Sequence, residues 1–261
     1  MVLLLQNRVE TIGVQGHPAE LMLESGRVIR YVAAKDANPR AETRAVYDEN
    51  DVDGHHHPMR TRKSSFYTPL DETDDWEGVN ALCQVLDTIV DVEAEHDFMD
   101  GKSALEIGYA TGLPAIFALE SGANDVAIHC PSKVTLDGYV RATMRRNTVA
   151  PSQLKLTHGD VAECAVAIRG KKFDIIFAPE VLNCPKEQYE AVHDVLDQAL
   201  ANDGICFLTS RLTYFNSSGS LPEFLALVKL RRTFVPLVRW TSPASDIVPR
   251  QVIQLTRNLA F

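Results

Sequence analysis

The chain has 261 residues, of which 45% are hydrophobic, and its 26 basic and 35 acidic residues give a formal net charge of −9. This length and apolar content allow one sizeable core, so we expect one domain with an N-terminal elaboration. The acidic balance disfavours broad affinity for nucleic-acid phosphates, although the local basic stretch RATMRRN at 141–147 could still bind them.

The cysteines and the N-terminus indicate the cellular environment. The cysteines are odd in number, scattered and without CxxC spacing, which fits a reducing compartment and argues against a disulfide framework or a zinc site. They are Cys83, Cys130, Cys164, Cys184 and Cys206. The apolar run that follows Met1 is too short for a secretory signal, and no run approaches transmembrane length. We expect no membrane segment and a cytoplasmic or nuclear location, or an organellar one if a transit segment has been removed.

Residues 1–70 differ in character from the rest and are predicted to be an N-terminal β-rich extension of a domain at 71–261. Two strands are expected within 20–34 around a Ser25-Gly26 turn, followed by a polar stretch typical of a long or partly disordered loop. His55 to His57 suggest a metal site, but three consecutive side chains rarely face one ion. A solvated loop is favoured, and no metal is predicted.

From Trp76 onward, helical and strand patterns alternate. Helices are expected at 76–92, 113–122, 131–147, 186–200 and 221–230. Strands are expected at 103–108, 125–130, 154–160, 173–180, 205–210, 233–240 and 252–257, with a turn at Asp203-Gly204. This alternation predicts parallel βαβ crossovers and a doubly wound α/β sheet covered on both faces. Ligands bind such sheets at the carboxyl ends of the strands.

The loop after the first of these strands, in LEIGYATG, lies where the fold would place a ligand. Gly108 and Gly112 bracket the turn into the next helix, and glycine lets a ligand approach the backbone. Leu113-Pro114 replaces the Lys-Ser or Lys-Thr of a Walker loop, and the glycine spacing is not GxGxxG. Glu106, at the end of the strand, could orient a polar, cationic ligand.

This acid-x-Gly-x-Gly-x-Gly outline, with the βα order that follows it, resembles the class I S-adenosylmethionine-dependent methyltransferases over Trp76 to Phe261. The resemblance implies a Rossmann-like seven-stranded sheet and S-adenosyl-L-methionine as the cofactor. Within that superfamily the chain is most similar to the histidine protein methyltransferases. The segments that carry the similarity are WEGV at 76–79, GLPAI at 112–116, APEVLN at 178–183 and TYFNSSGSLPEF at 213–224.

The resemblance also implies roles for individual residues. Glu180, which follows the fourth strand, and Asn183 would act on the substrate, positioning an imidazole or amine or accepting its proton. Asp160 would lie near the adenine amine. The full set of implied cofactor residues is Glu106, Gly108, Tyr109, Ala110, Gly112, Cys130, Asp160 and Ala178.

Several positions depart from the group's pattern. Ala110 replaces the middle loop glycine, and Tyr109, at a small or cysteine position, could point across the cofactor pocket. The acid that would hold the ribose hydroxyls falls on His129 or Cys130, and neither reproduces a bidentate carboxylate. On the substrate side, Asn183 replaces an aromatic residue. The group's Trp-Glu pair on the preceding helix falls on Cys83 and Gln84.

Structural interpretations stand beside the functional ones. The two glycines could form a tight turn without a ligand, and Glu106 could cap a helix. Asp160 lies in a common Gly-Asp turn, and Glu180 could cap the helix near Lys186. His129 and His158 could contact the ligand or be buried, hydrogen-bonded residues.

We therefore expect an S-adenosylmethionine-dependent protein N-methyltransferase that acts on a histidine of a cytosolic protein. The alternative is a catalytically inactive methyltransferase-like subunit or assembly scaffold, since the departures gather at cofactor and substrate positions. The expected partner is a protein substrate or a protein complex. An RNA methyltransferase is disfavoured by the acidic charge and by the lack of an Asn-Pro-Pro-Tyr type motif.

Overall fold

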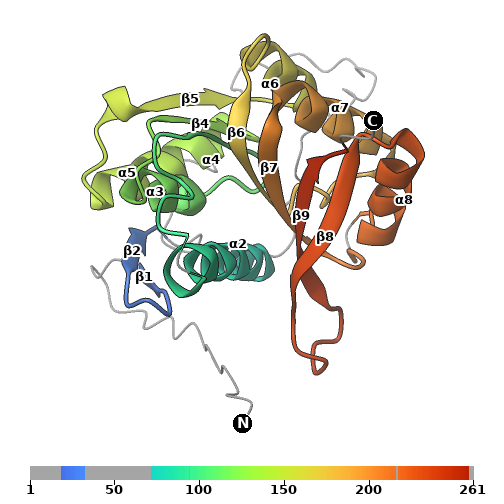
Figure 1. The fold of residues 1–261 in the computed structure, drawn as a ribbon, viewed down its shortest axis with the longest axis horizontal. Coiled ribbons are helices and arrows are strands. Elements are labelled where there is room, and N and C mark those ends of the chain that lie inside the picture. Colours follow the sequence, from blue (N-terminus) through green and yellow to red (C-terminus); the bar gives the residue numbers. More distant parts are fainter. Residues whose placement is uncertain (1–18, 33–71, 94, 216, 259–261) are drawn as a thin grey trace, which may run out of the picture.

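A seven-stranded sheet forms the centre of the protein (Figure 1). The computed structural model describes residues 19–32, 72–93, 95–215 and 217–258, and the His55 to His57 run lies outside them. The strand order is β5-β4-β3-β6-β7-β9-β8. The strands are β3 (Ser103–Glu106), β4 (Asp125–Cys130), β5 (Leu154–His158), β6 (Phe173–Pro179), β7 (Leu200–Arg211), β8 (Phe234–Thr241) and β9 (Arg250–Arg257).

The first five strands of the sheet are parallel, and β9 runs antiparallel to both β7 and β8. From β3 the chain adds β4 and β5 on one side and later adds β6 and β7 on the other. The strand order therefore reverses between β3 and β6, and the carboxyl ends of these strands meet at the edge where doubly wound folds bind ligands.

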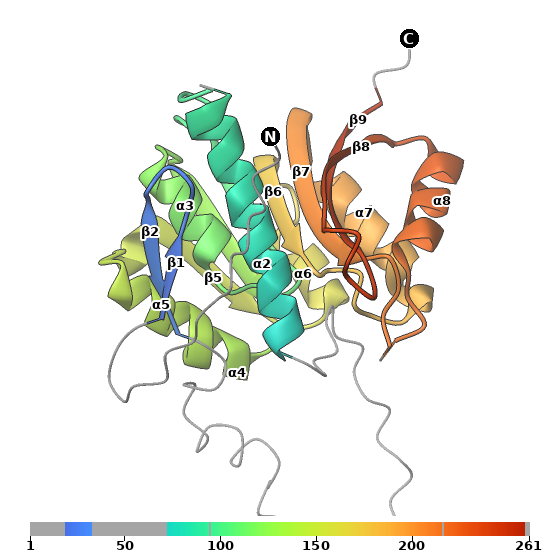
Figure 2. The ribbon, with the colours of Figure 1, turned by 90° about the horizontal axis from the view of Figure 1, so that it is seen from below.

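Helices cover both faces of the sheet (Figure 2). One face carries α2 (Glu72–Asp87), α3 (Leu113–Glu120), α4 (Lys133–Thr135) and α5 (Arg141–Arg146). The other carries α6 (Val161–Ala167), α7 (Tyr189–Ala199) and α8 (Leu221–Arg231). Short π-helical turns lie at Thr88–Val92 and Leu136–Val140, and short 3-10 turns at Pro151–Gln153 and Lys186–Gln188.

Successive side chains of the parallel strands point to opposite faces of the sheet, so each face has its own hydrophobic core. On β6, Ile175 and Phe177 pack with α2 and α3, whereas Ile176 and Ala178 pack with α7. Both sets are almost fully buried, because a parallel sheet covered by helices leaves neither face to solvent. This confirms the predicted α/β fold.

The N-terminal hairpin of β1 (Ala19–Met22) and β2 (Val28–Tyr31) packs on the helices of the first face. Asp87 on α2 accepts hydrogen bonds from the backbone N–H of Ser25 at 2.9 Å and from its hydroxyl at 2.7 Å. Arg27 lies over the ring of Phe117 at 4.4 Å. The two predicted strands and their turn are thus confirmed, and the hairpin shares the core of the 71–261 region.

The sequence did not predict α6, and several element boundaries differ from prediction. The first helix begins at Glu72, before the expected Trp76, because polar N-terminal turns carry no apolar periodicity. The predicted turn at Asp203-Gly204 falls inside β7, where the pairing jumps from Phe173–Leu200 to Ile175–Ile205 and leaves an irregularity. Of the helices in the described residues, none is long and apolar enough to span a membrane.

Candidate functional site

Glu106 holds the GYATG loop against the start of α3. Its carboxylate is fully buried, and its Oε1 accepts hydrogen bonds from the backbone N–H groups of Thr111 and Gly112, both at 2.8 Å. Its Oε2 accepts one from Ala115 at 3.1 Å. Burial raises the pKa of Glu106 to about 7, although the three N–H donors act in the opposite direction. Glu106 therefore orders the loop and caps α3.

The two loop glycines satisfy close packing inside the protein. Gly108 has φ of +80°, and a Cβ there would lie 2.5 Å from the carbonyl oxygen of Pro179 at the end of β6. Gly112 has φ of +87°, and its Cβ would lie 2.6 Å from Cε of Met144. Packing against the backbone therefore requires glycine at position 108, whereas at position 112 the positive φ favours glycine and the flexible Met144 methyl can move. The predicted contact of both glycines with a cofactor stays a prediction.

The other predicted cofactor residues near the loop are buried. Tyr109 is buried, and its backbone N–H donates to the carbonyl of Pro179 at 2.7 Å. Ala110 and Ala178 are fully buried, Ala178 within the core of the second face. The end of β3, the loop and the end of β6 therefore form one packed unit at the carboxyl edge.

The expected ribose-binding position carries no carboxylate. Cys130, the last residue of β4, is fully buried and packs in the core of the first face. Burial, reinforced by the negative charge of Glu106, raises the pKa of its thiol. His129 is also buried, and its ring lies 2.9 Å from the hydroxyl of Thr157 and 3.2 Å from the carbonyl of Gly159. This is the buried, hydrogen-bonded arrangement that the sequence left open for His129.

Asp160 caps α6. Its Oδ1 accepts hydrogen bonds from the N–H groups of Ala162 and Glu163 at 3.0 and 2.9 Å, and Glu163 in return accepts from the N–H of Asp160 at 2.8 Å. This is a reciprocal capping box. Because both capping bonds use Oδ1, the Oδ2 atom can still accept a hydrogen bond from a ligand.

Glu180 lies at the centre of a buried network. Its Oε1 accepts from Nε of Arg250 at 2.8 Å and from the hydroxyl of Thr209 at 3.3 Å, and its Oε2 accepts from the hydroxyl of Tyr214 at 2.6 Å. Arg250 also donates to Glu77 on α2 at 3.1 Å. The network joins α2, β6, β7 and β9 at the carboxyl edge. Glu180 does not cap the helix near Lys186, as one interpretation of the sequence suggested.

These contacts make the Glu180 carboxylate part of the protein's own hydrogen-bond network. The side chain is fully buried, and three protein donors already occupy its oxygens. Its backbone has φ of +50°, an unfavourable conformation for a glutamate that the surrounding network maintains. The geometry thus gives Glu180 a positioning role, and its predicted catalytic role stays a prediction.

Asn183, the second predicted catalytic residue, lies in the turn after β6. Its N–H donates to the carbonyl of Glu180 at 3.0 Å, so the Glu180 network fixes its backbone. Its side chain is 3% exposed, and among the described residues its Oδ1 has no hydrogen-bond partner. An unsatisfied buried amide oxygen is costly, so this atom can accept a donor from a bound molecule.

Sequence reasoning missed Arg250 and Thr209 in the network and the close approach of Gly78 to it. Arg250 was not singled out, and Gly78 was not recognised as the place where α2 approaches Glu180, although a Cβ at Gly78 would clash with that carboxylate. Tyr214, which lies in the 213–224 segment that carries the resemblance, is buried and donates to Glu180. The available signal was Arg250 two positions before the strand predicted at 252–257, because a buried arginine requires an acidic partner.

Two residues at positions of the family's Trp-Glu pair contribute to packing instead. Cys83 on α2 is fully buried, and Gln84 donates from its side chain to the carbonyl of Met22 on β1 at 3.1 Å. The helix therefore supports the N-terminal hairpin at the point where the resembled group carries its Trp-Glu pair.

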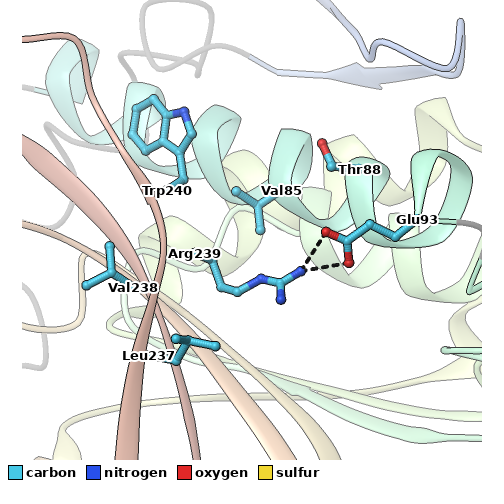
Figure 3. A pocket seen from close by; sticks show the side chains of 7 residues that line it. All are labelled: Val85, Thr88, Glu93, Leu237, Val238, Arg239 and Trp240. Carbon is cyan, nitrogen blue, oxygen red and sulfur yellow. Dashed lines mark hydrogen bonds and ion pairs between the residues drawn. The ribbon is translucent and has the colours of Figure 1, made fainter.

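A pocket of about 410 Å³ lies away from these residues, between α2 and β8 (Figure 3). Val85 and Thr88 border it on one side and Leu237, Val238 and Trp240 on the other. The Arg239 guanidinium reaches across it to the Glu93 carboxylate at 2.9 Å. None of the predicted site residues lines this pocket. Within the described part of the chain, no group of three or more His, Cys, Asp or Glu side chains could hold a metal ion.

A relative in Caenorhabditis elegans, described as "Uncharacterized protein F22B7.9", is 44% identical over 243 residues, which cover 92% of this chain and 93% of the relative. The chain belongs to the F22B7.9 family. No protein-family model matches it. A Dictyostelium discoideum protein described as "Histidine protein methyltransferase 1 homolog" is 26% identical over 162 residues, covering 62% of this chain and 52% of that protein.

The fold of this F22B7.9-family chain is that of the class I methyltransferases. Magnesium protoporphyrin IX methyltransferase from Synechocystis PCC 6803, solved with bound S-adenosylmethionine, superposes with a TM-score of 0.52 at 13% identity. The superposition covers 74% of this chain and 88% of that structure. This likeness establishes the fold, and the identity is too low to carry activity across.

Proposed function

We propose that the protein is an S-adenosylmethionine-dependent methyltransferase whose acceptor is a histidine side chain of another protein. The observation that carries the proposal is the Glu106-ordered loop at the point where the strand order reverses, in a sheet of methyltransferase topology. The weak sequence similarity to a histidine protein methyltransferase homolog supports the acceptor type.

The residues around the loop suit a positively charged nucleoside cofactor. Glu106 is a buried anion at the loop, and Asp160 at the end of β5 keeps Oδ2 available for an amine donor. Cys130 supplies no carboxylate for the ribose, so we expect the ribose to be held by other groups. S-adenosylmethionine would supply a methyl group on a cationic sulfur, and this chain would hold the acceptor in line with it.

Asn183 is the residue we assign to the acceptor. A neutral imidazole has one N–H donor and one nitrogen with a free lone pair. If Asn183 Oδ1 accepts that N–H, the opposite nitrogen is unprotonated and able to attack the methyl group. The Glu180 network would act by holding the Asn183 backbone in place.

Transfer of a tritiated methyl group tests this proposal. The full chain is incubated with labelled S-adenosylmethionine and protein fractions from cells that lack the enzyme, and mass spectrometry locates the methyl group. We expect methylhistidine in wild-type reactions and a loss of about tenfold or more in rate with Asn183→Ala. Asn258→Ala is the matched control, because the side-chain amide of Asn258 donates to the carbonyl of Arg232 at 3.0 Å, away from the predicted site. Label on lysine or nucleic acid would contradict the assigned acceptor.

A second function, a methyltransferase-like subunit without catalysis, is favoured by two observations. Cys130, at the position expected to bind the ribose, is buried, and the oxygens of Glu180 are occupied by protein donors. This alternative predicts a folded chain that neither binds S-adenosylmethionine nor transfers label.

A further inference from the structure

Two carboxylates at the carboxyl edge are equally buried but differ in their partners. Glu180 is fully buried and forms an ion pair with Arg250 at 2.8 Å. Glu106 is fully buried as well, yet its hydrogen bonds all come from neutral backbone N–H groups. No cationic side chain among the described residues stabilises its charge. A buried anion without a cation is an expensive arrangement that a positively charged ligand would relieve.

The ionisable groups packed around Glu106 do not supply the missing charge. Cys83 on α2 and Cys130 on β4 lie close enough for the Glu106 charge to act on their thiols, and Asp87 acts on Cys83 with the same sign. Both thiols have pKa values raised by burial and by the Glu106 charge, so they are neutral. Arg141 and Asp137, on the helical segment over Cys130, act on that thiol with opposite signs. Desolvation therefore dominates at Glu106 and raises its pKa to about 7.

Protonation of Glu106 would disturb the loop directly. In the charged state, Oε1 accepts two N–H groups and Oε2 accepts one. A protonated carboxyl oxygen becomes a hydrogen-bond donor. The partners of the Glu106 oxygens are all N–H donors, so the added proton would have no acceptor among them. At least one of the three bonds would then weaken, most simply the bond from Ala115 to Oε2. The charged form is thus the one that keeps the loop attached to α3.

We infer that binding of the cationic cofactor at the 108–112 loop is coupled to the release of a proton from Glu106. The inference rests on the proposed function, because it takes S-adenosylmethionine as the ligand. A cation near the loop stabilises the carboxylate and so favours the deprotonated form. By linkage, the charged form of Glu106 must in turn favour the cation.

This coupling predicts how the affinity changes with pH and how many protons are released on binding. A ligand that binds only the charged form, to a group with pKa about 7 in the free protein, loses about tenfold in affinity between pH 8 and pH 6. At pH 7 the binding event releases about half a proton from Glu106.

Calorimetric titration with S-adenosylmethionine at pH 6, 7 and 8 tests the inference. Each titration is run in two buffers of different ionisation enthalpy, so that the heat difference counts the protons released. Glu106→Gln removes the ionisable group. Asp174→Asn is the matched control, since Asp174 also accepts a backbone N–H, from Ser103 at 2.8 Å, but lies at the amino end of β6.

We expect Glu106→Gln to abolish the excess proton release and flatten the pH profile, whatever its absolute affinity. Asp174→Asn should keep the wild-type profile. The amino group of the free ligand titrates identically in every experiment, so the difference between wild type and Glu106→Gln reports the Glu106 carboxylate together with any ligand group coupled to it. Equal proton release and parallel pH profiles in wild type and Glu106→Gln would overturn the inference.

A second measurement covers the case in which Glu106→Gln does not fold. The wild-type and Asp174→Asn proteins are then titrated alone, and affinity that does not rise from pH 6 to pH 8 overturns the inference. Binding that is independent of pH leaves the proposed function standing. A folded wild-type protein that binds no S-adenosylmethionine at any pH refutes the proposed function, and this inference with it.

Discussion

At the scale of single residues, the two buried glutamates at the carboxyl edge show how similar side chains acquire different properties. Glu180 has a guanidinium, a phenol and a hydroxyl as donors, whereas Glu106 has backbone donors alone. Burial imposes a desolvation cost on each carboxylate, and the partner decides whether that cost is offset. The sequence located both acids but not Arg250, which lies 70 positions from Glu180.

The Glu180–Arg250 pair should therefore be sensitive to the loss of one partner. Arg250→Met leaves a buried carboxylate without its cation, and we expect a loss of about 3–5 kcal/mol in the free energy of unfolding. Arg239→Met, which breaks the more exposed pair with Glu93, should cost about 1 kcal/mol or less. Urea unfolding measures both. Equal losses for the two variants would show that the Glu180 network is not a strong structural element.

Gly108 gives a second residue-scale prediction. Gly108→Ala places a Cβ against the Pro179 carbonyl in a left-handed backbone conformation, whereas Gly170→Ala meets only the backbone strain, since no atom lies within 4 Å. We expect Gly170→Ala to cost about 1 kcal/mol and Gly108→Ala about 2 kcal/mol more because of overpacking. Thermal unfolding compares the two. A Gly108→Ala variant as stable as Gly170→Ala would indicate that the loop can move away from β6.

At the scale of elements, apolar periodicity predicted the strands and helices well because burial imposes it. The ends of helices and the irregularities in strands depend on local polar groups, which the apolar periodicity does not reveal. The capping box at Asp160 is one example, because Gly-Asp after a strand fits both a ligand-binding acid and a helix cap. The irregularity in β7 is another, since Asp203-Gly204 typically ends a helix and here lies within the strand.

The interface of α7 and α8 predicts a pH dependence of stability. His193 is buried, and burial lowers its pKa, as does the nearby Arg231, which lies 3.4 Å from its Nδ1. The imidazole of His193 binds a proton more tightly in the unfolded chain than in the folded one. The contribution of His193 to the free energy of unfolding is therefore fully present above about pH 6.5, the ordinary pKa of histidine, and is lost as the pH falls below that value. Unfolding at pH 7.5 and pH 5.5 should show a smaller loss in His193→Gln than in wild type. An unchanged loss would assign the effect to other groups.

At the scale of the whole molecule, the fold was predictable because the order of strands and helices and the glycine loop act together. The hydrogen bonds and ion pairs of the site were not predictable, because they join segments that are distant in the sequence. Asn183 was located by the resemblance of APEVLN to the related group, but its buried, unsatisfied oxygen required the structure. The hairpin was predicted as an extension, whereas its attachment through Ser25 and Asp87 to α2 could not be read from either segment alone.

The central claim is that the Glu106-ordered loop is a cofactor site in use. The most direct test is calorimetric titration of the full chain with S-adenosylmethionine at pH 8, where Glu106 is charged. We predict saturable binding of one ligand per chain in the micromolar range, weakened when Gly108 is replaced in a variant shown to be folded. Absence of binding at millimolar ligand to a folded chain would contradict the account and favour a protein that keeps the fold without the cofactor.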